Sequence, residues 1–140
     1  MFKTVLTLFR GSVAVAEEQL EDRTALVILD QQMRDAAAAV DRSKRTLALA
    51  IAQDQQEGRR LETTNARIAD LELRATAALD GGREDLAREA AQQIAGLEAD
   101  RDACMTARTL FAQEIARLKR HVSNAEARIT ELDRGRRIAR

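Results

Sequence analysis

The stretch Leu79-Asp-Gly-Gly-Arg-Glu-Asp-Leu-Ala-Arg-Glu89 contains the only double glycine of the chain. It separates two long segments with helical periodicity, in a sequence that has no proline. Glycine is preferred just after a helix C-terminus, and acidic residues are favourable in the first turn of a helix. Because short connections join antiparallel neighbours, the stretch predicts that one long helix ends, the chain reverses at residues 80–83, and a second helix begins.

The segment after the glycines carries the clearer pattern, with apolar residues alternating at steps of four and three over about six heptads. This spacing is typical of a helix packed in a coiled coil. Two arginines interrupt the seam. Its predicted positions are Ala90, Ile94, Leu97, Arg101, Cys104, Arg108, Phe111, Ile115, Leu118, Val122, Ala125, Ile129 and Leu132.

The segment before the glycines, from about Thr24 as a plausible N-cap, carries a less regular seam. Apolar residues fall at multiples of seven, with a second set at the accompanying spacing. A local bend or loosening is expected around residues 53–58, because Gly58 costs about 1 kcal/mol relative to Ala inside a helix. The predicted positions are Val40, Leu47, Leu61, Ile68 and Ala75, accompanied by Met33, Ala37, Ile51 and Leu79.

The first segment, residues 2–20, has apolar residues on one helical face and is followed by the polar stretch Glu-Glu-Gln-Leu-Glu-Asp-Arg-Thr. An amphipathic helix of this kind lies in a bilayer interface, or its stripe packs on the protein's own hairpin. The position at the terminus and two of the three phenylalanines favour the membrane. The candidate membrane-binding residues are Phe2, Lys3, Val5, Leu6, Phe9, Arg10 and Val13.

The predicted fold is therefore all-α: a long antiparallel coiled-coil hairpin preceded by an amphipathic helix. Residues 1–22 form the membrane-interacting helix and linker. Residues 23–140 form the hairpin, with arms at about 24–80 and 83–137. Since such a thin hairpin covers its apolar seam only partly, self-association is expected.

Composition argues against catalysis. The 140 residues are 33% charged and 2% aromatic, so a deep core around a pocket is not expected. The single cysteine, Cys104, and the single histidine, His121, are about 25 Å apart along one helix, which excludes a dyad within the chain. No metal-ligand spacing or phosphate-binding motif is present, so no catalytic residue, metal or cofactor is predicted.

Charge is balanced overall, but residues 117–140 carry eight basic and three acidic groups. This asymmetry favours an anionic partner or, alternatively, cations that complement a helix C-terminus. A nucleic acid is disfavoured, because no aromatic residues interleave with the basic ones. A lone cysteine fits a reducing compartment, no signal peptide is recognised, and no run is apolar enough to span a bilayer.

The order of these segments resembles the phage shock protein A family, which includes chloroplast and cyanobacterial relatives and is placed with ESCRT-III-like proteins. The opening helix, the Gln32-Met33 step before Asp35, and the later stretch from Leu118 to Arg137 are similar to family sequences. The most specific match is the motif that opens the second arm. It comprises Arg83, Glu84, Asp85, Leu86, Ala87 and Arg88.

The resemblance implies a non-enzymatic protein of bacterial membrane stress, peripheral on the cytoplasmic face of the inner membrane. It implies anionic phospholipid as a partner and, in some members, an AAA+ sigma-54 transcription activator held inactive by the hairpin. Two departures stand out: Arg23 occupies the place of a usual proline, and family members continue with further assembly helices beyond the point that corresponds to Arg140. A purely structural or regulatory coiled coil without membrane activity is the alternative.

Overall fold

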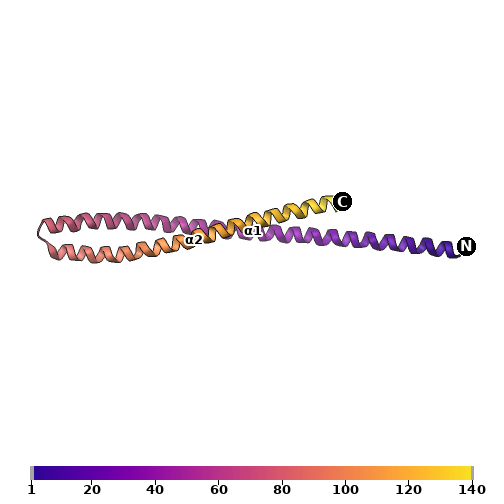
Figure 1. The fold of residues 1–140 in the computed structure, drawn as a ribbon, viewed down its shortest axis with the longest axis horizontal. Coiled ribbons are helices and arrows are strands. Elements are labelled where there is room, and N and C mark those ends of the chain that lie inside the picture. Colours follow the sequence, from indigo (N-terminus) through magenta and orange to yellow (C-terminus); the bar gives the residue numbers. More distant parts are fainter. Residues whose placement is uncertain (1, 140) are drawn as a thin grey trace. The chain divides into compact units, whose positions relative to one another are not determined.

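The computed structural model describes residues 2–139, and side chains are described from Arg10 to Ala139. Two helices make up this part of the chain: α1, Phe2–Asp80, and α2, Glu84–Ala139. No strand occurs among the described residues. The predicted all-helical class and the reversal at the double glycine are therefore confirmed (Figure 1).

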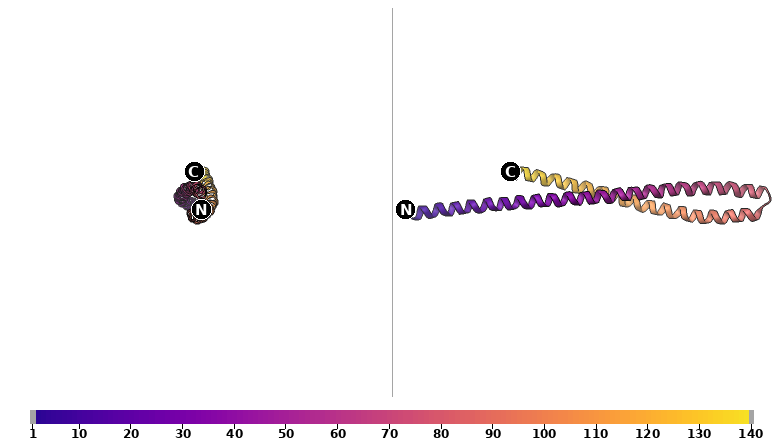
Figure 2. Two further views of the ribbon diagram at one scale, coloured as in Figure 1. Left: turned by 90° about the vertical axis from the view of Figure 1, so that its left-hand side faces the viewer. Right: turned by 180° about the vertical axis from the view of Figure 1, so that it is seen from behind.

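The two helices contribute to two compact units. One unit contains residues 1–43 and 121–140, and the other contains residues 44–120. In the second unit the two arms run antiparallel from the turn and lie side by side. Both arms are seen from the side in Figure 1 and in the right-hand view of Figure 2. In the first unit the end of α2 lies beside α1, where Arg136 bonds Asp30 at 3.4 Å between Nη1 and Oδ1.

The seam predicted for α2 is confirmed at every position. Each of the thirteen predicted residues is buried or half-buried, including the two arginines, and Ala87 extends the same pattern by one step towards the turn. Because apolar residues every 3.5 positions keep one stripe of a helix towards its partner, the periodicity was sufficient to identify this face.

The seam predicted for α1 is correct throughout its first set and, in the accompanying set, at Met33 and Ile51. Val40, Leu47, Leu61, Ile68, Ala75 and Met33 are buried or half-buried, whereas Ala37 and Leu79 are exposed. Ile51 is also half-buried, as predicted. The second set lies one residue earlier than predicted. Its members are Ala36, Ser43, Ala50, Glu57, Thr64, Leu71 and Ala78, all buried or half-buried.

The reason for the error is chemical. The true second set contains alanine and polar residues, so it lacks the apolar signal that periodicity detects. Thr64 is buried because its hydroxyl donates a 2.8 Å hydrogen bond to the carbonyl of Arg60, one turn back in α1. A threonine whose hydroxyl is satisfied in this way presents its methyl group to the seam.

The predicted separation of an N-terminal helix from the hairpin is not observed. Residues 17–24 are helical, and α1 continues through them without interruption. Thr24 is not an N-cap: its hydroxyl donates to the carbonyl of Leu20 at 2.9 Å, as in a helix interior. The helix also continues through Gly58, where a loosening was expected. Glutamate and arginine are good helix formers, so a polar linker without Gly or Pro stays helical.

Candidate functional site

The chain reverses through a Schellman motif at the two glycines. The N–H of Arg83 donates to the carbonyl of Ala78 at 2.7 Å, and the N–H of Gly82 donates to that of Leu79 at 3.0 Å. Gly82 has a φ of 73°, which places it in the left-handed region. These are the two bonds of a Schellman helix end, in which glycine avoids a clash between Cβ and the backbone.

The next helix starts with charges that complement its exposed N–H groups. Arg83 and Asp85 form a two-point ion pair, with Nε–Oδ1 at 3.2 Å and Nη2–Oδ2 at 3.3 Å. The Arg83 side chain, followed by the backbone N–H of Leu86, holds the pKa of Asp85 below its ordinary value. Glu84 lies 3.8 Å from Arg88 one turn on, measured from Oε2 to Nη2. These contacts fix the entry into α2.

The six residues of the predicted motif therefore divide into two roles. Ala87 is buried in the seam, and the other five side chains are exposed. The motif thus combines a helix start with a surface of mixed charge at the end of the second unit. Its role as a binding site stays a prediction.

Replacing Gly82 by alanine should lower the free energy of unfolding by about 1 kcal/mol, because an L-residue is strained at positive φ. Gly81 is the matched control, since its φ is not positive and an added Cβ would lie 3.4 Å from the carbonyl oxygen of Ala77. Urea denaturation followed by circular dichroism would measure both variants. Equal stability of the Gly82→Ala and Gly81→Ala variants would contradict the assignment of the strain to Gly82.

A polar layer crosses the seam in the middle of the second unit. Arg108 bonds Asp54 across the two helices, with Nε–Oδ1 at 3.1 Å and Nη2–Oδ2 at 3.4 Å. The hydrogen bond to Asp54, and the charge of that carboxylate, raise the pKa of Arg108. An added Cβ at Gly58 would lie 3.2 Å from the guanidinium, so the glycine leaves room for this arginine. Thus two residues that weaken the apolar pattern, Gly58 and Arg108, fit one another.

Beside this layer lies an open groove of about 390 Å³. It is lined by Asp54, Leu61, Met105, Arg108, Thr109 and Ala112. The charged groups at its edge already bond one another, and among the described residues no group of three His, Cys, Asp or Glu side chains is placed to hold a metal ion. The groove offers a surface recess, with no arrangement of a general acid and base.

Cys104 is buried in the seam, as predicted, with 3% of its surface exposed. Burial, followed by the nearby Glu57 carboxylate, raises the pKa of its thiol. Since the thiolate is the reactive form, a raised pKa and burial both suppress reactivity.

We expect the Cys104 thiol to react with a disulfide reagent at pH 8 much more slowly in the native chain than in urea. The reaction would be followed by the absorbance of the released thiolate. Because the native side chain is covered, the rate should track opening of the helix pair. A native rate equal to the rate in urea would contradict the burial of this side chain.

The predicted membrane-binding residues lie near the start of α1. The side chains of Phe2, Lys3, Val5, Leu6 and Phe9 lie outside the described ones. Arg10 and Val13 are described, and both are exposed. Every side chain from Arg10 to Ala25 is exposed, so this part of α1 packs against no other described residue to an extent that would cover it. No described helix combines the length and hydropathy that crossing a bilayer requires.

Residues 1–138 of the 140-residue chain match the PspA/IM30 family. The chain belongs to the PspA/IM30 family. Members of this family are structural and regulatory proteins and not enzymes.

Two relatives illustrate the similarity. The phage shock protein A homolog of Deinococcus radiodurans is 30% identical over 133 residues, which cover 95% of this chain and 59% of the relative. The uncharacterized protein YjfJ of Escherichia coli K12 is 28% identical over 142 aligned positions, covering 91% of this chain and 61% of the relative. The chain thus spans about three fifths of the length of these relatives.

Sequence reasoning missed three features of these surfaces. It did not pair Arg108 with Asp54, it did not place Glu57 in the seam, and it did not foresee the ion pair of Asp30 with Arg136. A signal for the first existed, because Asp54 occupies the heptad position between Leu47 and Leu61. A charged residue in a seam position calls for an opposite charge on the partner helix.

Proposed function

We propose that this PspA/IM30 family member is a peripheral protein of the membrane stress response that binds the cytoplasmic face of the inner membrane. The first part of α1 is the segment that contacts lipid. Family membership and the name of the Deinococcus radiodurans relative support the stress-response role. The observation that carries the lipid contact is the uninterrupted exposure of side chains from Arg10 to Ala25, among them Val13 and Leu20.

Elementary energetics favour this use of the segment. Transfer of apolar side chains out of water lowers the free energy of the system. Each cationic residue near an anionic surface contributes about 1 kcal/mol of binding free energy. Phe2, Val5, Leu6, Phe9 and Val13 would enter the interface. Lys3 and Arg10 would meet headgroup phosphates. An interfacial helix needs no partner protein to bury its apolar stripe.

A vesicle flotation assay with the 140-residue chain tests the proposal. We expect Val13→Asp combined with Leu20→Asp to reduce binding to vesicles containing phosphatidylglycerol by at least about tenfold, because two carboxylates enter the apolar face. The control is Leu73→Asp, which changes an exposed leucine of the second unit. Removal of residues 2–20 should abolish binding. Unchanged binding after that removal would contradict the proposal.

A second candidate function is the restraint of an AAA+ sigma-54 activator through the hairpin. The observation that favours it is the exposed surface of mixed charge at the turn, formed by Arg83, Glu84, Asp85 and Arg88. Inhibition of the activator's ATPase by the chain in the absence of lipid would support this function. Reversal of Glu84 and Asp85 to lysine should then relieve the inhibition. If the purified activator's ATPase is unaffected by the wild-type chain, this candidate is excluded for that activator.

A further inference from the structure

The continuity of α1 changes where its exposed apolar face ends. Residues seven apart lie close to the same direction of a helix, so Val13, Leu20 and Val27 share a face. Ile28 lies on the flank of that face. Their exposed fractions are 42% for Val13, 65% for Leu20, 64% for Val27 and 53% for Ile28. The apolar face therefore continues to Ile28, four residues beyond the polar stretch at residues 17–24.

The opposite face of the same part of α1 has a partner. Leu26, Leu29 and Met33 are half-buried, and a recess of about 220 Å³ is lined by Leu26, Leu29 and Ala139 together with Asp22 and Ala25. Since α2 occupies this side, Val27 and Ile28 face away from it. They do not belong to the seam between the two helices.

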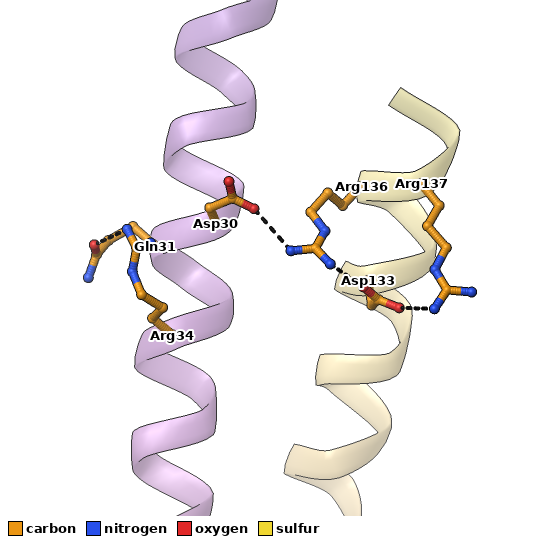
Figure 3. A network of polar contacts seen from close by, with 6 residues as sticks. All are labelled: Asp30, Gln31, Arg34, Asp133, Arg136 and Arg137. Carbon is orange, nitrogen blue, oxygen red and sulfur yellow. Dashed lines mark hydrogen bonds and ion pairs between the residues drawn. The ribbon is translucent and has the colours of Figure 1, made fainter. Parts of the chain in front are cut away.

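An ion-pair network holds α2 on that side. Arg136 of α2 contacts Asp30 of α1 at 3.4 Å and Asp133 of its own helix at 2.9 Å, and Arg137 contacts Asp133 at 3.1 Å (Figure 3). On α1, Gln31 accepts a hydrogen bond from Arg34 and donates one to Asp35. The separate contacts of Gln31 with Arg34 and Asp35 mark the point at which α1 becomes polar on its outer side. The apolar face thus ends at Ile28.

One polar group within this face, the hydroxyl of Thr24, is already satisfied, and Glu17 is exposed on the same face. Thr24 lies between Leu20 and Val27, and its hydroxyl donates to the carbonyl of Leu20. The hydroxyl therefore does not need water, and the threonine methyl group adds to the apolar side. Arg10 and Arg23 are exposed near the two sides of the face, where long cationic side chains can reach phosphate oxygens.

We propose that the lipid-contacting surface extends along the outer side of α1 to Val27 and Ile28, so that the membrane lies against the back of the helix while α2 covers its front. This inference rests on the proposed function. A segment confined to residues 1–22 would leave both side chains in water.

The observations favour lipid over a second copy of the chain as the occupant. A stable protein interface buries roughly 800 Å² on each partner. Four partly exposed aliphatic residues and a threonine supply only a part of that area. Insertion into a bilayer interface does not need a complementary protein surface, and each apolar side chain that enters contributes favourable binding free energy independently of the others. The alternation of aliphatic residues with Arg10, Glu17 and Arg23 also suits a headgroup region better than a protein core.

Single tryptophans test the inference, because the chain contains neither Trp nor Tyr and one introduced indole reports only its own position. The probes are Val13→Trp for the proposed function, Val27→Trp and Ile28→Trp for the extension, and Leu73→Trp as an exposed control in the second unit. Each 140-residue variant is titrated with phosphatidylglycerol-containing vesicles, with and without brominated acyl chains. Far-ultraviolet circular dichroism confirms that each variant is helical.

We expect a blue shift and bromine quenching at positions 13, 27 and 28, and neither effect at position 73. A response at position 13 with none at positions 27 and 28 would overturn the extension and leave the proposed function standing. No response at any of the three positions would overturn both. A blue shift at position 27 that requires a high protein concentration and no lipid would overturn lipid as the occupant in favour of a second copy.

Discussion

The substitution Leu118→Ala should lower the free energy of unfolding by about 2 kcal/mol, near the lower limit for a buried leucine. Leu118 is 5% exposed and lies in the seam of α2. Its loss removes transfer free energy and leaves a cavity that a two-helix seam can close only in part. The lower limit applies because solvent reaches the seam from both sides, so the neighbouring side chains can collapse into the space.

Leu110 provides the matched control, since it lies on the same helix and is 61% exposed. Leu110→Ala should change stability by less than about 0.5 kcal/mol, because alanine is the better helix former and little surface is lost. Urea denaturation monitored at 222 nm gives both values. If the two variants lose the same stability, the assignment of Leu118 to the core is wrong.

The second prediction concerns the polar layer of Arg108 and Asp54. Arg108→Asp should lower the melting temperature by about 5 °C or more, because two carboxylates then face one another across the seam in place of an ion pair. Combining it with Asp54→Arg should restore most of the loss, because opposite charges again meet between the helices. Thermal circular dichroism of the four chains of this cycle gives the coupling.

Glu114 and Arg117 provide the comparison for that cycle. They form an exposed ion pair within α2, with Oε1 and Nη2 in direct contact. The hydrogen bond between them lowers the pKa of Glu114 and raises the pKa of Arg117, so both shifts favour the charged forms. Exchanging these two residues should have little effect, since exposed pairs contribute little to stability. The contrast separates a general electrostatic effect from one that fixes the alignment of two helices. Equal effects at the two sites would contradict a special role for the layer.

The extent to which the sequence predicted the fold depends on where apolar residues coincide with the packing. In α2 they coincide throughout, so the face was correct to the residue. In α1 the set at Ser43, Ala50, Glu57 and Thr64 is small or polar, and Ala37 and Leu79 supplied a more apolar but incorrect set. Periodicity detects hydrophobicity, and it does not detect a seam filled by hydroxyls, carboxylates and methyl groups.

The boundary of the first helix could not be predicted for a different reason. Glu17, Glu18, Glu21 and Asp22 interrupt an apolar stripe, which indicated a linker. Charge alone does not end a helix, because the backbone bonds of α1 are made whatever the side chains do. The double glycine was a reliable signal, since it changes the backbone itself. The five membrane-binding side chains from Phe2 to Phe9 stay a prediction.

The tight turn at Gly82 has a consequence for the order in which the second unit assembles. Bringing together chain segments separated by few residues costs little entropy, and each further pair of positions then closes only a small additional loop. We therefore expect pairing of the two helices to begin next to the turn, with Ala78 and Ala87, and to extend stepwise along both arms away from the turn. The charged layer at Asp54 and Arg108 is reached later. We expect this layer to oppose pairing in the wrong register, because a shifted alignment of the two helices would place an unpaired charge in the seam.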